Sequence, residues 1–380
     1  MKKERSSLLR NNGIQTLISS LLCIFGGLLI GYLVLLIINP AGASAAITAI
    51  IKSCLNYPGA LQLKYFGQTL VRTVPLLMCA LSVLFAYKVG MFNIGVAGQY
   101  VAGACLGLYA ALAWDMPWYV CLLLAAAAGA ILGAISGALN TLCNMNVVIS
   151  GIMLNWIALY LTNMVLIKVK SPNSPYTLGL RGNNNDALIP SMGLETLFKN
   201  EKSITIAIPL AIVVAVVIWI VLNKTKFGYE LKATGNNVHA AKYCGMQEKS
   251  NIILTMMISG ALAGLGAGLI YLTGIEEWET TITSVPAMGF NGIAVAFLGG
   301  LDPFGSILAA LFIQWITLGG TFVDLQVYSP QISGLISSLI IYLCAFVAFF
   351  KFFMETRLRK AQEKNDAKLA ANKEEGGEEK

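Results

Sequence analysis

Long apolar runs, separated by short polar segments, make up most of this chain of 380 residues. A helix needs about 20 apolar residues to cross the hydrocarbon core of a bilayer. The pattern therefore predicts an all-α fold, a polytopic transmembrane helix bundle of about ten spans, within a range of about 8–10. The runs have the approximate bounds 15–38, 69–87, 91–113, 117–139, 146–167, 203–222, 251–273, 287–300, 303–322 and 331–353.

Two of these runs differ from a simple span. The eighth run, 287–300, is short, and Pro303 separates it from the ninth, which predicts a broken or re-entrant pair. The first run follows basic residues, as the core of a signal peptide would. Its apolar stretch is longer than a signal peptide requires, and other spans follow it, so a retained first helix is predicted.

The composition supports a membrane protein. Hydrophobic residues make up 57% of the chain and charged residues 12%, about half the charged fraction of a soluble domain. A single soluble domain is excluded, and so are a disordered chain and a disulfide scaffold. Most of the 26 Lys and Arg residues fall on one side of the bilayer when the N-terminus is cytoplasmic and ten spans follow. The C-terminus is then cytoplasmic as well.

This topology divides the chain into three parts. Residues 1–14 form a cytoplasmic N-terminal segment, 15–353 the transmembrane domain, and 354–380 a cytoplasmic charged tail. The transmembrane domain carries two long polar connections, an external loop at about 169–202 and a cytoplasmic loop at about 223–250.

Candidate catalytic and metal-binding groups are scarce. The eight cysteines occur singly and His239 has no partner histidine, so no disulfide framework and no metal site is predicted. Ser136 and Ser259 have no basic residue within the spans to activate them. The dipeptide Gly-Lys never occurs, which excludes a phosphate-binding P-loop, and no basic patch with interleaved aromatics indicates a nucleic-acid partner. We predict that the chain is not an enzyme.

The spans contain uncharged polar residues but no ionisable residue far from an end. Proton-coupled carriers usually place carboxylates or basic groups on their ion path, so their absence argues against such a carrier and against a charged cargo. A buried amide needs a partner, which is either another helix or a wet path. As a set, the amides suit a path for a neutral polar solute, and they are Asn93, Gln99, Asn140, Asn144, Asn146, Asn155, Asn163, Asn291 and Gln314.

Small residues recur at four-residue spacing, which lets helix backbones approach closely. The pairs and triplets are Gly27/Gly31, Gly103/Gly107, Gly129/Gly133/Gly137 and Gly260/Gly264/Gly268.

The cytoplasmic loop contains a predicted short helix. Asn237 can cap a helix that runs through Val238 to Tyr243, and Gly245 would end it. Such an amphipathic helix either fits the groove of a partner protein or lies at the lipid headgroups, and its residues alone favour neither interpretation.

Three sequence blocks resemble the permeases of ATP-binding-cassette (ABC) importers for ribose, branched-chain amino acids and nucleosides. The cytoplasmic loop is similar to their coupling region at Gly228, Lys232, Ala233, Gly235, Asn237, Ala240, Ala241 and Gly245. The second block is 89–99, and the third is 289–299 followed by Pro303 and Gly305, which looks like the nucleoside and simple-sugar branch. Ala97 stands where the family often has Glu, and Asn291 where Asp is common.

The resemblance implies a transport subunit with several partners. Two ATP-binding subunits would dock on the 223–250 loops and hold ATP and Mg²⁺, so this chain itself would bind no cofactor. A second homologous permease chain, or a copy of this one, would complete the path. An extracellular solute-binding lipoprotein would deliver cargo to the outer loops, and the assembly would sit in a bacterial cytoplasmic membrane.

The leading hypothesis is an importer permease for nucleosides. Within the ABC-importer permeases, the alternative is a permease of the same type for ribose or another simple sugar. Outside this class, the alternatives are an ATP-independent secondary carrier and a membrane scaffold. Phe92, Trp156 and Phe290 could contact a nucleobase or simply pack. The candidate path residues are Phe92, Asn93, Gln99, Asn155, Trp156, Phe290 and Asn291, and the candidate coupling residues are Gly228, Lys232, Gly235, Asn237, Ala240, Ala241 and Gly245.

Overall fold

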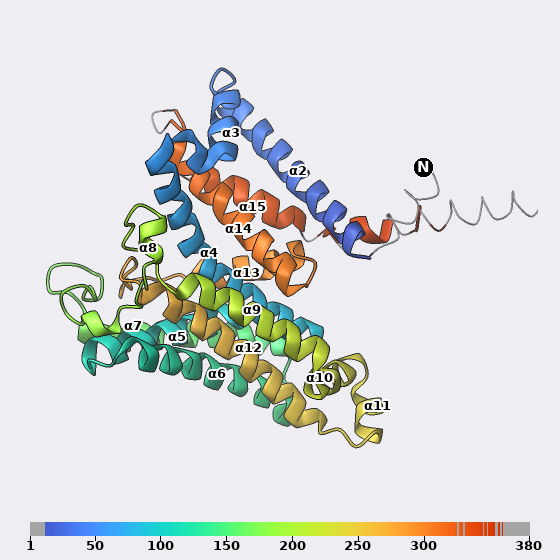
Figure 1. The fold of residues 1–380 in the computed structure, drawn as a ribbon. Helices are drawn as coiled ribbons and strands as arrows, with labels where there is room; N and C mark the ends of the chain where they lie inside the picture. Colours follow the sequence, from blue (N-terminus) through green and yellow to red (C-terminus); the bar gives the residue numbers. More distant parts are fainter. Residues whose placement is uncertain are drawn as a thin grey trace, which may run out of the picture.

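The computed structural model describes residues 12–324, 327–329, 331–344, 346–347, 349–353, 356–357 and 359. It is a bundle of helices, with α2 along one edge and the hairpin of α5 and α6 along another (Figure 1). The predicted segments 1–14 and 354–380 lie largely outside the described residues. The sidedness of the termini stays a prediction.

The predicted all-α helix bundle is confirmed. Among the described residues, eight helices are long and apolar enough to cross a membrane. They lie within α2 (Asn12–Ile38), α4 (Gly59–Lys88), α5 (Val96–Ala113), α6 (Trp118–Cys143), α7 (Val147–Leu166) with η2 (Ile167–Val169), α9 (Ala207–Lys224), α12 (Glu248–Tyr271), and α14 (Pro303–Gly319) with η4 (Gly320–Phe322).

Shorter helices complete the bundle. α13 (Ala287–Leu298) and α15 (Ile332–Cys344) fall on the eighth and tenth predicted runs. One apolar helix was not predicted, α3 (Ala43–Lys52) with its extension η1, because it is too short to score as a span. The other short elements are η1 (Ser53–Asn56), η3 (Asn185–Ala187), α8 (Leu194–Leu197), α10 (Lys226–Asn236) and α11 (Val238–Tyr243).

The predicted break between the eighth and ninth runs occurs at Pro303. α13 has 12 residues and is about 18 Å long, so it covers only part of a bilayer. Pro303 occupies the first turn of α14, where its missing N–H costs nothing, and the Asp302 carboxylate caps that turn by accepting from the backbone N–H groups of Phe304 (3.0 Å) and Gly305 (3.1 Å). The two helices therefore form a broken pair.

Helix α12 lies at the centre of the packing, against α4, α5 and α6. Its glycines touch the backbones of the neighbours. A Cβ on Gly264 would lie 2.3 Å from the Ala125 carbonyl oxygen of α6, and one on Gly103 of α5 would lie 2.4 Å from the Gly264 Cα. The predicted close approach at four-residue spacing is confirmed here. On α2, Gly27 approaches the Ile340 backbone of α15, and Gly31 packs against the Ile336 side chain.

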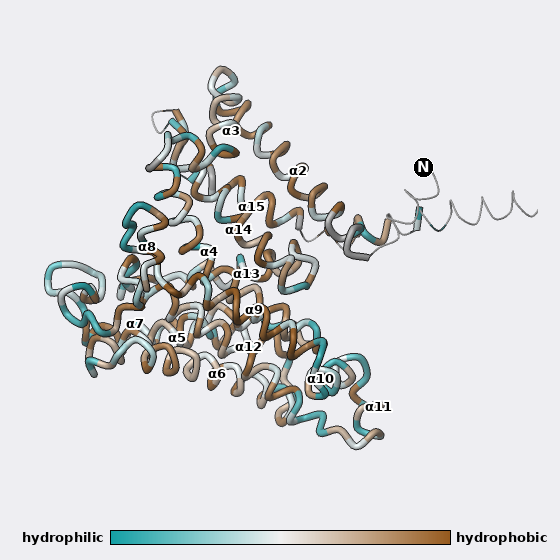
Figure 2. Tube along the Cα trace, viewed as in Figure 1, coloured by the Kyte–Doolittle hydropathy of each residue, from teal (hydrophilic) through white to brown (hydrophobic). Residues whose placement is uncertain are grey.

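The helices differ in how much of their surface faces outward. In the most apolar window of α4, 89% of the residues are buried, whereas in α2 only 22% are. Apolar residues such as Phe25 and Ile37 of α2 are exposed, which fits contact with lipid tails. Figure 2 shows the hydrophobic colour along the helix bodies and the hydrophilic colour gathered at the connecting loops.

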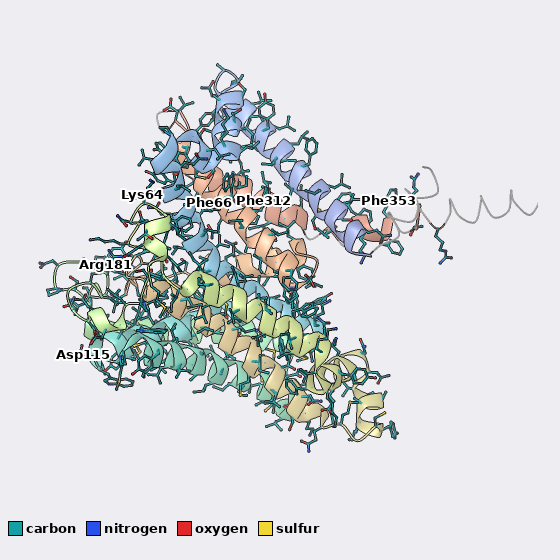
Figure 3. All side chains as sticks on the ribbon, viewed as in Figure 1. Lys64, Phe66, Asp115, Arg181, Phe312 and Phe353 are labelled. Atoms are coloured by element: carbon teal, nitrogen blue, oxygen red, sulfur yellow. The ribbon has the colours of Figure 1, made fainter. Side chains whose placement is uncertain are left out.

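The connecting loops define two ends of the bundle. One end holds the 169–202 loop, and we call it the outer end, following the predicted topology; the other holds α10 and α11, and we call it the inner end. Figure 3 places Lys64, Arg181 and Asp115 along the outer end and Phe353 on the opposite side of the view.

We predict that Gly260→Ala disrupts this packing. The added Cβ would lie 2.1 Å from the Gly129 carbonyl oxygen, so two helices must separate, at a cost of about 1–3 kcal/mol. Gly334→Ala on α15 is the matched control, because a Cβ there would have no neighbour within 4 Å among the described residues, its own helix turn apart. The melting temperature of the purified protein measures both variants, and equal values for the two would contradict the packing described here.

Candidate translocation and coupling sites

The three sequence blocks that carry the family resemblance meet in space. The second block begins at the inner end of α4, where a Cβ on Gly90 would lie 2.8 Å from the Gly235 carbonyl oxygen of the coupling loop. Its later part touches the third block, because a Cβ on Gly289 would lie 2.4 Å from the Ala97 Cα. The second block thus contacts the coupling loop at Gly90 and the third block at Ala97, although the partners are far apart in the sequence.

The predicted short helix of the coupling loop is confirmed as α11. The Asn237 side chain accepts from the Ala240 N–H at 3.0 Å, and Gly245, with φ +77°, follows the helix in the left-handed region. Ala241 is buried, whereas Ala240 is exposed and Tyr243 is 94% exposed. The helix therefore presents Ala240 and Tyr243 outward and uses Ala241 for packing.

A second helix of this loop, α10, was missed by the sequence analysis. Thr225 caps it by accepting from the Gly228 N–H at 3.0 Å, and Gly228 sits against the Val221 carbonyl of α9. The sequence signal for α10 is Thr225 at the cap position, followed by helix-forming residues. Lys232 is half-buried on α10.

The coupling loop is fastened to two long helices. Gly235 packs against Val89 at the end of α4, because a Cβ there would lie 2.1 Å from the Val89 carbonyl oxygen. The Asn251 amide of α12 donates to the Thr234 hydroxyl at 2.9 Å, and both residues are buried. A displacement of α10 would therefore act on α4 and α12 together.

Asn93 and Gln99 belong to a buried polar cluster with Ser82 and Ser259. The Asn93 amide donates to the Gln99 side-chain oxygen and to the Ser259 hydroxyl, both at 2.8 Å. The Ser259 hydroxyl donates to the Ser82 carbonyl at 2.8 Å. These four residues, each at most 1% exposed, join α4, α5 and α12. In this conformation they bond to one another and leave no side chain exposed.

The Asn155 side chain of α7 hydrogen-bonds to the backbone at the start of α5. Its side-chain oxygen accepts from the Gly98 N–H at 2.7 Å and its amide donates to the Ile94 carbonyl at 3.1 Å. Gly98 lets the two backbones approach, because a Cβ there would meet Asn155 at 2.7 Å. Three of the candidate path residues, Asn93, Gln99 and Asn155, are thus brought together around one loop and one helix start.

The other four candidate path residues lie apart from this cluster. Phe92 is half-buried and packs edge-on against Tyr87, with ring centroids 6.5 Å apart. Trp156 is 41% exposed and stacks on Tyr160, so it points away from its buried neighbour Asn155. On α13, Phe290 is exposed and Asn291 half-buried.

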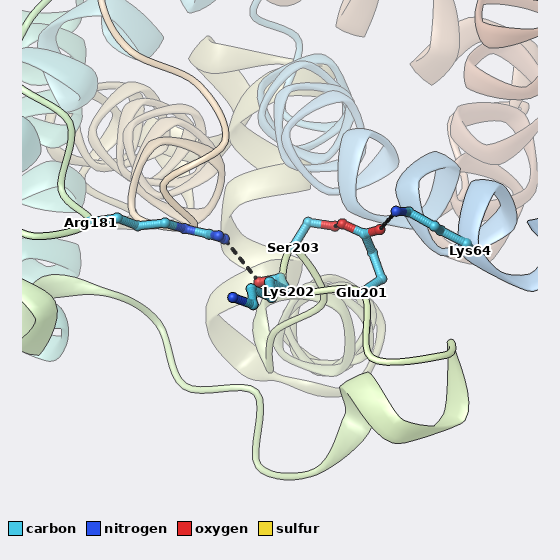
Figure 4. Close-up of polar contacts among 5 residues, drawn as sticks. All are labelled: Lys64, Arg181, Glu201, Lys202 and Ser203. Atoms are coloured by element: carbon cyan, nitrogen blue, oxygen red, sulfur yellow. Dashed lines mark hydrogen bonds and ion pairs between the residues drawn. The ribbon is translucent and has the colours of Figure 1, made fainter.

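The outer end carries charged residues that tie loops to α4. The Lys64 ammonium lies 3.3 Å from the Glu201 carboxylate, which also accepts from the Ser203 hydroxyl at 2.9 Å (Figure 4). Arg181 donates to the Lys202 carbonyl at 3.1 Å in the same view. About two turns further along α4, Arg72 lies 3.5 Å from Glu276 of the loop after α12.

A cavity of about 340 Å³ also opens at the outer end, between η1, α4 and the end of α14. The sequence analysis did not find it. The signal was present on α4, where Tyr65, Gln68 and Arg72 follow one another at spacings of three and four and so share a helix face. The residues lining the cavity are Ser53, Cys54, Tyr57, Tyr65, Gln68, Thr69, Arg72, Leu318, Thr321 and Phe322.

Comparison with known proteins identifies the family. The family described as the branched-chain amino acid transport system / permease component matches residues 65–345. The chain belongs to this family. It is therefore a transport permease component and a multi-pass protein of the cytoplasmic membrane.

Several relatives align along most of the chain. The guanosine ABC transporter permease protein NupP of Bacillus subtilis is 34% identical over 291 residues, which cover 76% of this chain and 82% of the relative. The nucleoside ABC transporter permease protein NupB of Lactococcus lactis is 33% identical over 309 residues, covering 78% and 82%. The glucose ABC transporter permease protein TsgB13 of Haloferax volcanii is 29% identical, covering 75% and 78%. No solved structure matches.

We predict that the two serines of the repeated pentapeptide Ile-Ser-Gly-Ala-Leu respond differently to removal of the hydroxyl. Ser259→Ala leaves the Asn93 amide without one acceptor, at a cost of about 1–2 kcal/mol. Ser136→Ala removes a buried hydroxyl that has no hydrogen-bond partner among the described residues, so its stability should change little. Denaturant unfolding of both purified variants compares them. A larger loss for Ser136→Ala would show that the cluster around Asn93 carries no special stability.

Proposed function

We propose that this chain is the permease subunit of an ABC importer that moves nucleosides across the cytoplasmic membrane. The observation that carries the proposal is the 34% identity over 76% of the chain to a guanosine ABC transporter permease. A second relative, which is named a nucleoside ABC transporter permease, aligns over a similar length. The cargo is neutral in this proposal, which agrees with spans that hold amides and hydroxyls in place of ionisable groups.

A simple sugar is the second candidate cargo. It is supported by the glucose permease relative, at 29% identity over 75% of the chain. Sugars and nucleosides share hydroxyl groups, and they differ in the aromatic base. Competition between the two solutes therefore separates the candidates.

The proposed partners follow from the two ends of the bundle. Two ATP-binding subunits, which would hold ATP and Mg²⁺ and carry out hydrolysis, would dock on α10 and α11. A second homologous permease chain, or a copy of this one, would complete the path. A solute-binding lipoprotein would deliver the solute at the outer end.

The coupling mechanism uses contacts of this chain. Closure of the ATP-binding subunits would displace α11 through its outward residues Ala240 and Tyr243. The displacement would pass through Gly235 to the end of α4 and through Thr234 to Asn251 of α12. Both long helices carry a residue of the polar cluster, Ser82 and Ser259, so their relative movement would alter it.

The proposed path includes the buried cluster. In this conformation the side chains of Asn93 and Gln99 bond to each other, and that of Asn155 bonds to the backbone. When the permease switches between outward and inward access, these polar groups would become free to bind the solute. Phe92, Trp156, Phe290 and Asn291 would contact the solute or the second permease chain. These roles are part of the proposal.

We predict that deletion of the gene abolishes saturable uptake of labelled guanosine and uridine by the native host. In the parent strain, excess unlabelled nucleoside should compete with uptake of the labelled nucleoside, whereas ribose should not. Restoring the gene on a plasmid controls for polar effects of the deletion. Unchanged uptake in the deletion strain would contradict a nucleoside cargo, and competition by ribose would favour a sugar.

We predict that Ala240→Glu weakens association with the ATP-binding subunits. The exposed carboxylate would face the docking surface without changing the interior, so the permease should still reach the membrane. Copurification of the ATP-binding subunit with the tagged permease measures the effect, expected to fall by about tenfold or more, which corresponds to 1.4 kcal/mol.

Met192→Glu is the control for this variant. Met192 is 74% exposed in the loop at the outer end, so the same charge is added on the other side of the bundle. Normal copurification with Ala240→Glu would place the docking surface elsewhere than on α11.

A further inference from the structure

The outer cavity combines three aromatic rings in one corner. Tyr57 and Tyr65 stack with their ring centroids 4.7 Å apart, and Phe322 meets both edge-on, at 5.2 Å and 5.6 Å. Hydrogen bonding with the Tyr65 phenol raises the pKa of Tyr57 above its ordinary value. Flat apolar surface of this kind binds the face or edge of another aromatic ring.

Polar groups surround the rings. Thr69 and Thr321 each donate to a carbonyl of their own helix turn, which leaves their oxygens as acceptors. The Gln68 amide makes no hydrogen bond within the described chain, although it lines the cavity. Among the described residues of the lining, Arg72 alone carries an ionic charge, and Glu276 balances it at 3.5 Å. The lining therefore suits a neutral ligand with several donors and acceptors.

Ser53 adds an independent indication of a ligand. Its hydroxyl is fully buried and has no hydrogen-bond partner among the described residues. Its backbone has φ 47° and ψ −121°, a conformation that a non-glycine residue adopts only at a cost. Unsatisfied buried polar atoms and backbone strain concentrate where a ligand completes the site.

The position of the cavity connects it to the rest of the molecule. It opens at the outer end, beside the loops that Lys64 and Arg72 hold through Glu201 and Glu276. The same helix that supplies Tyr65, Gln68 and Arg72 ends at Lys88, next to the Gly90 contact with the coupling loop. A ligand in the cavity would therefore touch the helix that meets the coupling loop at its other end.

We propose that this cavity is an entry site for the solute, in which an aromatic base packs against Tyr57, Tyr65 and Phe322 while Gln68 and Arg72 hydrogen-bond to its polar atoms or to its ribose hydroxyls. The volume of 340 Å³ falls within the range of about 300–1,000 Å³ found for small-molecule sites. The identity of the ligand as a nucleoside rests on the proposed function. The site itself lies apart from the amide cluster around Asn93.

Protection of an introduced thiol tests occupancy of the cavity directly. Thr321 is exposed and lines the cavity, so Thr321→Cys can react with a maleimide from outside. Lys52→Cys is the matched control, because Lys52 is exposed beside Ser53 but does not line the cavity. Both are placed in a background with serine at the exposed Cys143 and Cys244, and labelling of that background is subtracted.

The labelling is done on membranes of the host that hold the complete transporter. Guanosine at about ten times its dissociation constant should slow labelling of Thr321→Cys roughly tenfold, because only the unoccupied fraction reacts. Ribose should give no protection, and Lys52→Cys should label at the same rate with or without guanosine. Equal protection by ribose would overturn the assignment of the rings to an aromatic base.

A pair of variants at Tyr65 gives a second, functional readout. Tyr65→Leu removes the ring and should raise the guanosine concentration for half-maximal uptake roughly tenfold, and Tyr65→Phe keeps the ring and should raise it less than about threefold. Equal values for the two variants at equal membrane abundance would contradict the proposal. If Tyr65→Leu fails to accumulate, the thiol protection decides.

The outcomes separate this site from the proposed function. If the wild-type host takes up guanosine through this gene but guanosine does not protect Thr321→Cys, the entry site is overturned and the nucleoside permease stands. If uptake of guanosine does not depend on the gene at all, the proposed function fails first.

Discussion

Backbone-to-backbone contact through glycine is the constraint on which the rest of this structure depends. In a bilayer, lipid tails surround a helix as well as another helix would, so association relies on close packing and hydrogen bonds. Gly260 and Gly264 bring α12 against α6 and α5 at distances that no side chain would permit. Ser259, next to Gly260, then lies within reach of Asn93, and the buried polar cluster follows from the same approach.

The two helices α4 and α12 carry the remaining functional contacts. α4 runs from the aromatic cavity at the outer end to the glycine contact with the coupling loop, and α12 is bonded to the same loop through Asn251. Gly235 and Thr234 attach the coupling loop to α4 and α12, and Gly228 packs against the Val221 carbonyl of α9, so force applied at α11 reaches the bundle through these contacts.

The sequence predicted the all-α bundle, the break at Pro303 and the short helix capped by Asn237, because hydropathy, proline and capping act locally. It also indicated the small residues that pack α12. It could not show that Asn93, Gln99 and Ser259 bond to one another, since that depends on tertiary contact between α4, α5 and α12. The outer cavity could not be predicted because its rings come from three separate places, Tyr57 directly after η1, Tyr65 on α4 and Phe322 on η4. Polar residues at the start of α4 also shifted the predicted span to 69–87. The path and coupling roles of individual residues stay predictions.

We propose that transport by this chain is driven by ATP bound at the inner end of the bundle. The most direct test is uptake of guanosine into proteoliposomes that contain the complete transporter and its solute-binding protein, with ion gradients collapsed by ionophores. Uptake should require ATP on the side that carries the 223–250 loop and should be unaffected by the ionophores. Uptake that persists without ATP and stops when the ion gradients collapse would contradict the account and identify an ion-coupled carrier.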